Sequence, residues 1–264
     1  MRAHRHLILP MLTVLMGIVG CGPPDAPKEY EALMGYIFEH TADEDDEALV
    51  QGLQNLADYL KGDQLAEAQA GYALGTIPKD AIKGLAGHKH TNQGLEGVSL
   101  VTQSGYGSKK LMEALTQYSF KTIMPDVYLT YDRSFDEGKG CIVDRDCLWA
   151  EGDVYSVADW GLLGEVEADR RIEFRWVKTD DGWFFLQRWW LTAPSMGSKL
   201  DLRIQDQYYI GINYKGGNGT RRIHASWLQM EMSTGNATEG GANQLIKSWE
   251  KDAEDLDAWM DENL

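Results

Sequence analysis

Residues 126–232 constrain the fold most, because they form a series of short runs rich in aromatic and β-branched side chains. Such runs are typical of β-strands. The turns Asp180-Asp181-Gly182 and 216–219 (Gly-Gly-Asn-Gly) supply the positive φ angles that tight hairpins need. The sequence therefore predicts antiparallel strands at 126–135, 147–157, 165–178, 183–193, 200–214 and 220–232.

Other patterns flank this series on both sides. Residues 98–106 read as a further strand, and residues 108–121 carry apolar side chains at helical spacing before Pro125 ends the helix. Gly240-Gly241 breaks the strand pattern ahead of a final helix, whose water-facing side is acidic. The apolar stripe of that helix consists of Leu245, Ile246, Trp249, Leu256, Trp259 and Met260.

Residues 29–95 predict a helical segment ahead of the strands. Residues 29–39 have a helical pattern, and residues 41–44 (Thr-Ala-Asp-Glu) fit a capping box at the start of a second helix. A third helix, interrupted by a glycine and a proline, is expected within residues 66–85. The acidic run 43–47 lacks the alternate spacing and the glycine of a calcium loop, so we assign it to helix capping.

The order of these elements resembles the START-like helix-grip superfamily, which includes polyketide cyclase-like proteins. The helix 108–121 with the following 123–127 (Ile-Met-Pro-Asp-Val) is similar to the first helix of that superfamily and its entry into the second strand. The resemblance implies an α+β fold for residues 96–264, a curved antiparallel sheet of about seven strands around a long C-terminal helix. It also implies a cavity between sheet and helix, which in many members holds a lipid, sterol, polyketide or similar apolar ligand.

Large aromatic side chains in the strands and the last helix are compatible with such a cavity, and equally with a filled core. Arginines also fall mid-strand, at 133, 175, 188 and 203, and we expect them to pair with carboxylates such as Asp132, Glu173 or Asp206. One of them could instead meet an acidic ligand head group. The candidate ligand contacts are Trp176, Trp189, Tyr208, Trp227, Trp249 and Arg188.

No catalytic motif is evident, since the chain has no G-x-S-x-G elbow, P-loop or dinucleotide-binding glycine pattern. His224 is either a general base or, as we expect, a hydrogen-bonded structural residue. His88-Lys-His90 has the spacing of metal ligands, but no carboxylate or third histidine is near in the sequence. We therefore expect no catalytic residues, no metal and no cofactor.

The first residues carry the pattern of an export signal. Arg2 and Arg5 precede an uncharged segment, 7–19, that is too short to span a bilayer. The following 18–21 (Ile-Val-Gly-Cys) resembles the lipobox of bacterial lipoproteins. The resemblance implies a signal peptide at 1–20 and lipidation of Cys21; an ordinary signal peptide is the alternative. Residues 21–28, rich in proline, would then be the lipidated cysteine and a short tether.

Export also bears on the two remaining cysteines. An oxidising compartment favours a disulfide between Cys141 and Cys147, closing a seven-residue loop. Chain-entropy arguments give so small a ring roughly 2 kcal/mol of stabilisation. Two thiolates without a nearby histidine would make a poor metal site.

The net charge of −16 limits the partners, because an acidic surface repels phosphate backbones and anionic lipid head groups. We expect no nucleic-acid partner and attachment to the bilayer only through Cys21. Gly22 after the cysteine favours the outer membrane, facing the periplasm.

The sequence thus predicts a monomeric, non-catalytic, membrane-anchored periplasmic lipoprotein that binds an apolar or amphipathic small molecule. One alternative is an envelope structural or interaction protein with a filled core; another is a cyclase-like enzyme of the same fold. A cavity of several hundred Å³ would favour binding, and a histidine paired with a carboxylate inside it would favour an enzyme.

Overall fold

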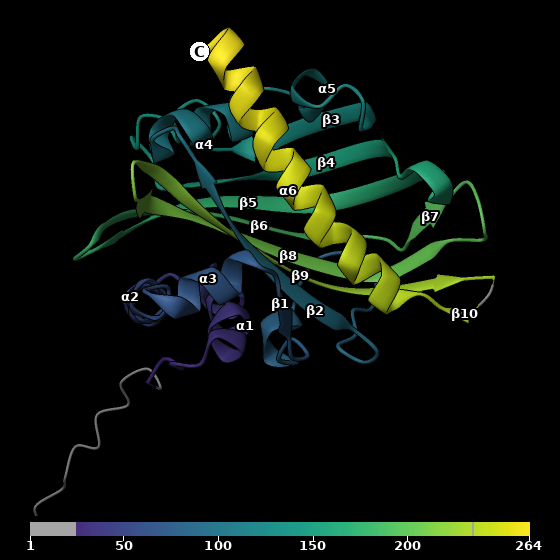
Figure 1. The fold of residues 1–264 in the computed structure, drawn as a ribbon, viewed down its shortest axis with the longest axis horizontal. Helices are drawn as coiled ribbons and strands as arrows, with labels where there is room; N and C mark the ends of the chain where they lie inside the picture. Colours follow the sequence, from purple (N-terminus) through teal and green to yellow (C-terminus); the bar gives the residue numbers. More distant parts are fainter. Residues whose placement is uncertain (1–24, 234) are drawn as a thin grey trace, which may run out of the picture.

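The structure is a computed structural model that describes residues 25–233 and 235–264. One antiparallel sheet of ten strands dominates these residues. The strands are β1 (Tyr72–Leu74), β2 (Glu96–Ser104), β3 (Tyr128–Glu137), β4 (Trp149–Asp159), β5 (Glu165–Thr179), β6 (Gly182–Leu191), β7 (Ser195–Gly197), β8 (Arg203–Gly216), β9 (Gly219–Met232) and β10 (Gly235–Asn236). The main path runs β1-β2-β9-β8-β6-β5-β4-β3; β7 pairs with β5 and β8, and β10 with β9 (Figure 1).

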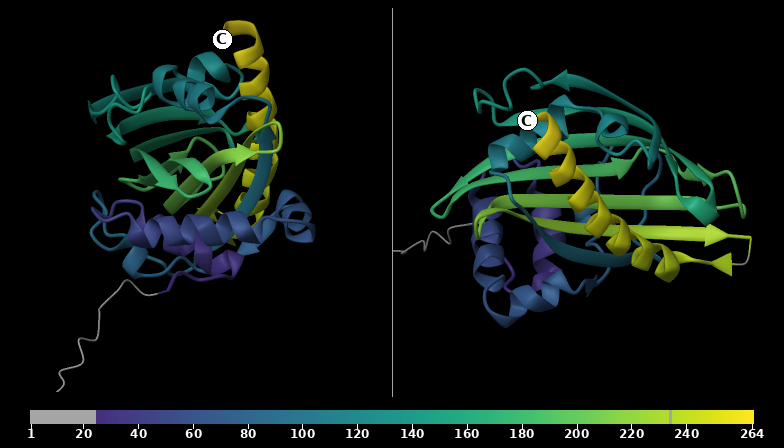
Figure 2. Two further views of the ribbon diagram at one scale, coloured as in Figure 1. Left: turned by 90° about the vertical axis from the view of Figure 1, so that its left-hand side faces the viewer. Right: turned by 45° about the horizontal axis from the view of Figure 1, so that its top comes forward.

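Helices cover both faces of this sheet. They are α1 (Tyr30–His40), α2 (Glu47–Tyr59), α3 (Asp63–Gln69), α4 (Ser108–Gln117), α5 (Phe120–Ile123) and α6 (Thr238–Asn263). The sheet curves around α6, and we call the face crossed by α6 the concave face (Figures 1 and 2). Helices α1–α3 pack on the opposite, convex face, while α4 and α5 lie near β3 at the far end of the sheet.

The side chains of β6 show why both faces must be covered. Phe184 and Leu186 belong to the core that includes α1 and α2, whereas Phe185 belongs to the core that includes Leu256 and Met260 of α6. Alternate residues of a strand point to opposite faces, so a strand with large apolar side chains on both faces needs cover on both sides. Phe184 therefore faces the convex side of the sheet, and Phe185 faces the concave side.

The N-terminal helices form part of the same body as the sheet. The Tyr30 hydroxyl lies 2.7 Å from Ser99 Oγ of β2, and Arg188 Nη1 of β6 donates to the carbonyl of Phe38 at 2.8 Å. β1, which follows α3, extends the sheet by pairing with β2. The helical segment 29–95 and the sheet therefore share one core.

The structure confirms the predicted α+β fold class, a curved antiparallel sheet with a C-terminal helix and N-terminal helices. Three local predictions are wrong. Residues 41–44 form no capping box, because α2 begins only at Glu47, and Thr41 Oγ1 donates back to the carbonyl of Ile37 at 2.6 Å. Residues 66–85 hold the end of α3, the short strand β1 and a 3₁₀ turn (Asp80–Ile82) instead of one broken helix. The final helix begins at Thr238 and runs through Gly240-Gly241 instead of starting after them. A Cβ on Gly241 would lie only 2.7 Å from Met230 Cε, so glycine at this position lets the helix approach β9.

The disulfide predicted between Cys141 and Cys147 is present in the loop between β3 and β4. That loop rests on the sheet, since Trp176 Nε1 donates to the carbonyl of Ile142 at 2.9 Å. Within residues 25–233 and 235–264, no helix has the length and apolar content to cross a bilayer. The predicted signal peptide and Cys21 lie outside the described residues.

Candidate functional site

The concave face carries a group of arginines that lack acidic partners. We call them the concave-face arginines: Arg133 on β3, Arg170 on β5 and Arg222 on β9. In the described part of the chain, no carboxylate oxygen lies within 4 Å of their guanidinium nitrogens. Arg171, Arg175 and Arg188, which point the other way, each have such an ion pair. In a chain with a net charge of −16, this difference between the faces calls for a physical explanation.

Arg133 is directed at the end of α4. Its Nη2 donates to the carbonyls of Thr116 and Tyr118 at 2.6 and 2.9 Å, and its Nη1 donates to the carbonyl of Leu115. The last carbonyls of a helix have no partner within the helix, so a guanidinium group satisfies them. Burial lowers the pKa of Arg133. This contact accounts for the end of α4 at Gln117, ahead of the predicted end at residue 121.

Arg170 lies among polar and aromatic groups. Its Nη1 donates to Ser156 Oγ at 2.6 Å, and its guanidinium carbon lies 5.0 Å from the centre of the Trp189 ring, within cation–π range. Its Nε is buried and has no hydrogen-bond partner among the described residues. Arg170 stands opposite Val154 in the β4–β5 register, and this places it on the concave face.

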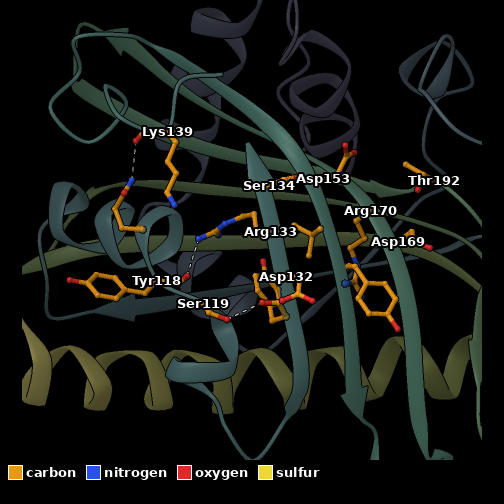
Figure 3. A pocket seen from close by; sticks show the side chains of 14 residues that line it. Tyr118, Ser119, Asp132, Arg133, Ser134, Lys139, Asp153, Asp169, Arg170 and Thr192 are labelled. Carbon is orange, nitrogen blue, oxygen red and sulfur yellow. Dashed lines mark hydrogen bonds between the residues drawn. The ribbon is translucent and has the colours of Figure 1, made fainter. Parts of the chain in front are cut away.

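A cleft of about 650 Å³ opens at this end of the sheet, where the α4–α5 junction meets β3, β4 and β5 (Figure 3). Figure 3 shows Arg133 and Arg170 among its lining side chains, together with Tyr118 and Lys139. Tyr131 adds an aromatic wall, and burial raises the pKa of its hydroxyl, so the ring stays neutral. The cleft thus combines aromatic surface and two guanidinium groups with three carboxylates, those of Asp132, Asp153 and Asp169.

A chain of ring contacts leads from Arg170 to α6. Trp189 stacks on Tyr209 with ring centroids 5.1 Å apart, the Tyr209 hydroxyl lies 2.8 Å from His224 Nδ1, and the His224 ring stacks on Trp249 at 5.4 Å. Burial lowers the pKa of His224 well below its usual value, and a neighbouring arginine lowers it further. The imidazole is therefore neutral and serves as a hydrogen-bonding group.

Arg222 is the most deeply buried of the three arginines, with 5% of its surface exposed. Its Nε and Nη1 have no hydrogen-bond partner among the described residues. Burial lowers its pKa, and the charges that oppose this effect include Asp257 and Asp252 of α6. Burial in turn raises the pKa of Asp252 to about 6, although Arg222 acts in the opposite direction. Asp252 therefore compensates Arg222 only in part.

The structure divides the six candidate ligand contacts between the two faces. The concave face holds Trp176, Trp189 and Trp249, and the convex face holds Arg188, Tyr208 and Trp227. Phe38 of α1 packs edge-to-face on Tyr208 and Trp227, with ring centroids 6.1 and 6.0 Å apart. The convex-face residues belong to the core under α1–α3 and share no site with Trp249.

The mid-strand arginines meet varied partners. Arg188 Nη2 pairs with Glu173 Oε2 at 2.6 Å, as expected, and burial raises the pKa of Glu173 even though Arg188 lowers it. Arg175 pairs instead with Asp46, just before α2. Arg203 is exposed. The expectation of carboxylate partners thus holds for Arg175 and Arg188, while Arg133 binds carbonyl groups.

The expectation that His88 and His90 have no carboxylate neighbour is wrong. Asp206 Oδ1 lies 3.0 Å from His88 Nε2 and 3.0 Å from His90 Nδ1. Asp206 is 116 residues away from His90 in the sequence, so only the fold brings these groups together.

Arg170 and Arg222 were not among the predicted ligand contacts, although the sequence contains a signal for Arg170. Counting back by two from the core residue Trp176 passes through Phe174 and Ile172 and reaches Arg170, all on one face. The burial of Arg222 follows from the position of α6 and could not be read from a single strand.

No protein-family profile matches the sequence, and no curated protein matches it. Among solved structures, the chain is similar to Ara h 8.0201 at 10% identity and a TM-score of 0.37, covering 64% of this chain and 100% of the other. It is similar to the lipid transfer and protein localization domain of human StarD13 (11% identity, TM-score 0.36, 80% and 96% covered). A STAR-related lipid transfer protein fragment from Xanthomonas axonopodis is a further example (15%, 0.33, 61% and 95%). No conclusion is drawn from these similarities, and by its own topology the chain has an α+β fold, an antiparallel sheet curved around a C-terminal helix.

Proposed function

We propose that the protein binds an amphipathic small molecule whose acidic head group contacts Arg170, one of the concave-face arginines. The observation that carries this proposal is the absence of carboxylate partners for these arginines among the described residues. A buried guanidinium group loses hydration that the protein does not replace. An anionic ligand group would supply the missing acceptors through charge-assisted hydrogen bonds.

The cleft at the α4–α5 junction is the preferred place for this ligand. Its volume of about 650 Å³ falls in the range of small-molecule sites. Along α6, by contrast, Trp249, Leu256 and Met260 are buried in the core. The ligand would therefore enter between α4–α5 and the strands β3–β5, with Arg170 at its head group.

The polar groups of the concave face favour binding over catalysis. His224 contacts the Tyr209 hydroxyl and lies 3.3 Å from Thr102 Oγ1, and no carboxylate of the described residues pairs with it. A neutral imidazole without an acidic partner lacks the orienting group of a general-base pair. We propose a binding protein on this ground, with a cyclase-like enzyme as the alternative.

We further propose that the protein is a lipoprotein of a bacterial envelope, held at the outer membrane by Cys21 and facing the periplasm. The basic start, the short apolar segment and the lipobox-like 18–21 support this proposal. A small acidic protein of this kind would present its ligand site close to a membrane that supplies amphipathic molecules.

Binding is tested with oleate and, as the uncharged comparison, oleyl alcohol. Native mass spectrometry and calorimetry should show one oleate per protein and weaker binding of the alcohol. Arg170→Met should weaken oleate binding about 10-fold or more, since a hydrogen bond to a charged group contributes about 1.5–3 kcal/mol. The matched control, Arg203→Met, removes an exposed arginine of β8 and should leave binding unchanged. Equal binding of both probes, or no effect of Arg170→Met, would contradict the proposed head-group contact.

A further inference from the structure

A second cluster of chemically active side chains lies on the convex side of the sheet. It joins the loop before β2 to the start of β8 and consists of His88, His90 and Asp206. The Asp206 and His90 side chains are 3% and 5% exposed, and the His88 side chain is 21% exposed. From this cluster we infer a binding site for a divalent transition-metal ion, Zn²⁺ by preference, that is independent of the cleft at α4–α5.

The donor atoms have the spacing that a metal site requires. Asp206 Oδ1 is 3.0 Å from both His88 Nε2 and His90 Nδ1, and all three atoms lie within 4.8 Å of one another. Zinc binds imidazole nitrogen and carboxylate oxygen at about 2.0–2.2 Å, which puts tetrahedral ligands roughly 3.3 Å apart. Small side-chain movements would bring the three atoms to bonding distance, and His88 Nε2, which lies 3.1 Å from the carbonyl of Gln205, would exchange its hydrogen and that contact for the metal. Two imidazoles and one carboxylate also suit zinc chemically.

Hydrogen bonds around the cluster already orient its members. His90 Nε2 donates to the carbonyl of Ala86 at 3.0 Å. His90 Nδ1 shares a proton with Asp206 Oδ1 at 3.0 Å, and a bound metal would take the place of that proton. The carboxylate of Asp206 accepts from the Tyr208 hydroxyl at 2.9 Å and from the backbone N–H of Thr91 at 3.3 Å. Outer partners of this kind fix metal ligands in place and tune their affinity.

The loop that carries both histidines is fixed to the body of the protein. Gly87 has a φ of 111°, and a Cβ there would lie 2.5 Å from the carbonyl oxygen of Thr192. The next residue, His88, donates its backbone N–H to that same carbonyl at 3.0 Å. Trp190 Nε1 also donates to the carbonyl of Ala86 at 2.9 Å. The site is therefore preorganised, which lowers the cost of assembling it.

The metal would keep a position open to solvent. A cleft of about 430 Å³ adjoins the cluster and is lined by His88, His90, Lys79, Asp80, Ile82, Lys83, Gly84 and Leu85. Three protein ligands with a fourth position held by water is the arrangement of exchangeable zinc sites. The two lysines would favour an acidic molecule at that position.

The test uses tag-free protein freed of metal by chelation and titrated with Zn²⁺ in a calorimeter. We expect one Zn²⁺ per protein, and zinc X-ray absorption should show two imidazoles in the first shell. His90→Ala and Asp206→Asn should each lower the affinity roughly 100-fold, and Tyr208→Phe, which loses only an outer hydrogen bond, about 10-fold. The X-ray absorption measurement needs no variant, so it decides the question even if a substitution prevents folding.

One control separates this site from other histidines. His40 forms a similar pair with Asp43 at 2.6 Å, but it belongs to no such three-residue cluster in the described part of the chain. His40→Ala should leave the zinc affinity unchanged. If the protein binds no zinc, a proton alone bridges His90 and Asp206 and the proposal fails. It also fails if Asp206→Asn binds zinc as tightly as the unaltered protein, or if the zinc shell lacks imidazole.

Discussion

Trp249 is the residue through which α6 contacts the polar interior of the sheet. It is 7% exposed, stacks on His224 and lies 6.1 Å from the Tyr209 ring, measured between centroids. Trp249→Ala should lower the free energy of unfolding by about 3–5 kcal/mol, because the large ring has packed neighbours on several sides. Urea denaturation measures this, with Trp249→Phe as the comparison that keeps a ring and loses less. A loss below about 1 kcal/mol would show that the ring borders empty space.

Asp252 gives the protein a pH dependence with a definite sign. Burial raises the pKa of this carboxyl to about 6 in the folded protein, compared with about 4 when unfolded. The folded state thus binds the proton more tightly, so the contribution of Asp252 to stability is largest below pH 4 and is lost as the pH rises from 4 to 6. Asp252→Asn should remove this loss and stabilise the protein by about 2–3 kcal/mol at pH 7.5, with little effect at pH 4.

The matching measurement is urea denaturation of both proteins at a series of pH values. Comparing the variant with the unaltered protein isolates Asp252, because other groups such as His224 titrate in both. A constant difference between the two proteins from pH 4 to pH 7.5 would contradict the assigned shift.

At the scale of elements, the N-terminal helices are required cover for the sheet. They bury one face of the central strands, including Phe184, Leu186, Ile210 and Trp227. A chain of residues 96–264 alone would expose this apolar face to water, and such surfaces drive aggregation. We expect the truncated chain to be insoluble or to bind a hydrophobic dye, whereas residues 25–264 should melt cooperatively. A soluble, cooperatively folding 96–264 fragment would show that the helices form a separate unit.

The sheet could be predicted because its signals are local. Alternating side chains and glycine turns specify each hairpin, so the predicted strands match β2 to β9 apart from the three-residue β7. The cover of the convex face could not be predicted, because β6 is apolar at nearly every position and its pattern says only that both faces are buried. The contact of His88 and His90 with Asp206 depends on the packing of a loop against a distant strand, for which one sequence holds no signal.

For the whole molecule, the net charge and the proposed lipid anchor have opposite effects on membrane attachment. The net charge of −16 repels anionic membrane surfaces, so the proposed attachment depends on lipid at Cys21. Residues 21–29 precede α1 and include three prolines. The predicted tether 21–28 is too long, because Ala26 and Pro27 are bound to α2: Ala26 N–H donates to Gln51 Oε1 at 3.0 Å, and Asn55 Nδ2 donates to the carbonyls of Ala26 and Pro27 at 3.0 and 2.9 Å. Extended at about 3.1 Å per residue, residues 21–25 would hold the body roughly 15 Å or less from the bilayer.

Cys21→Ser should therefore release the protein from the membrane completely. The net charge of −16 repels anionic lipid head groups, so the proposed lipid at Cys21 has to supply the attachment. Metabolic labelling with a fatty-acid analogue should mark the unaltered protein and not the variant, and membrane fractionation should move the variant to the soluble fraction. Cys141→Ser with Cys147→Ser is the control, because it removes the other thiols and should leave labelling intact. Ligand binding at Arg170 should be the same in the anchored and released forms. A Cys21→Ser protein that still takes up label and sediments with membranes would overturn the proposed anchor.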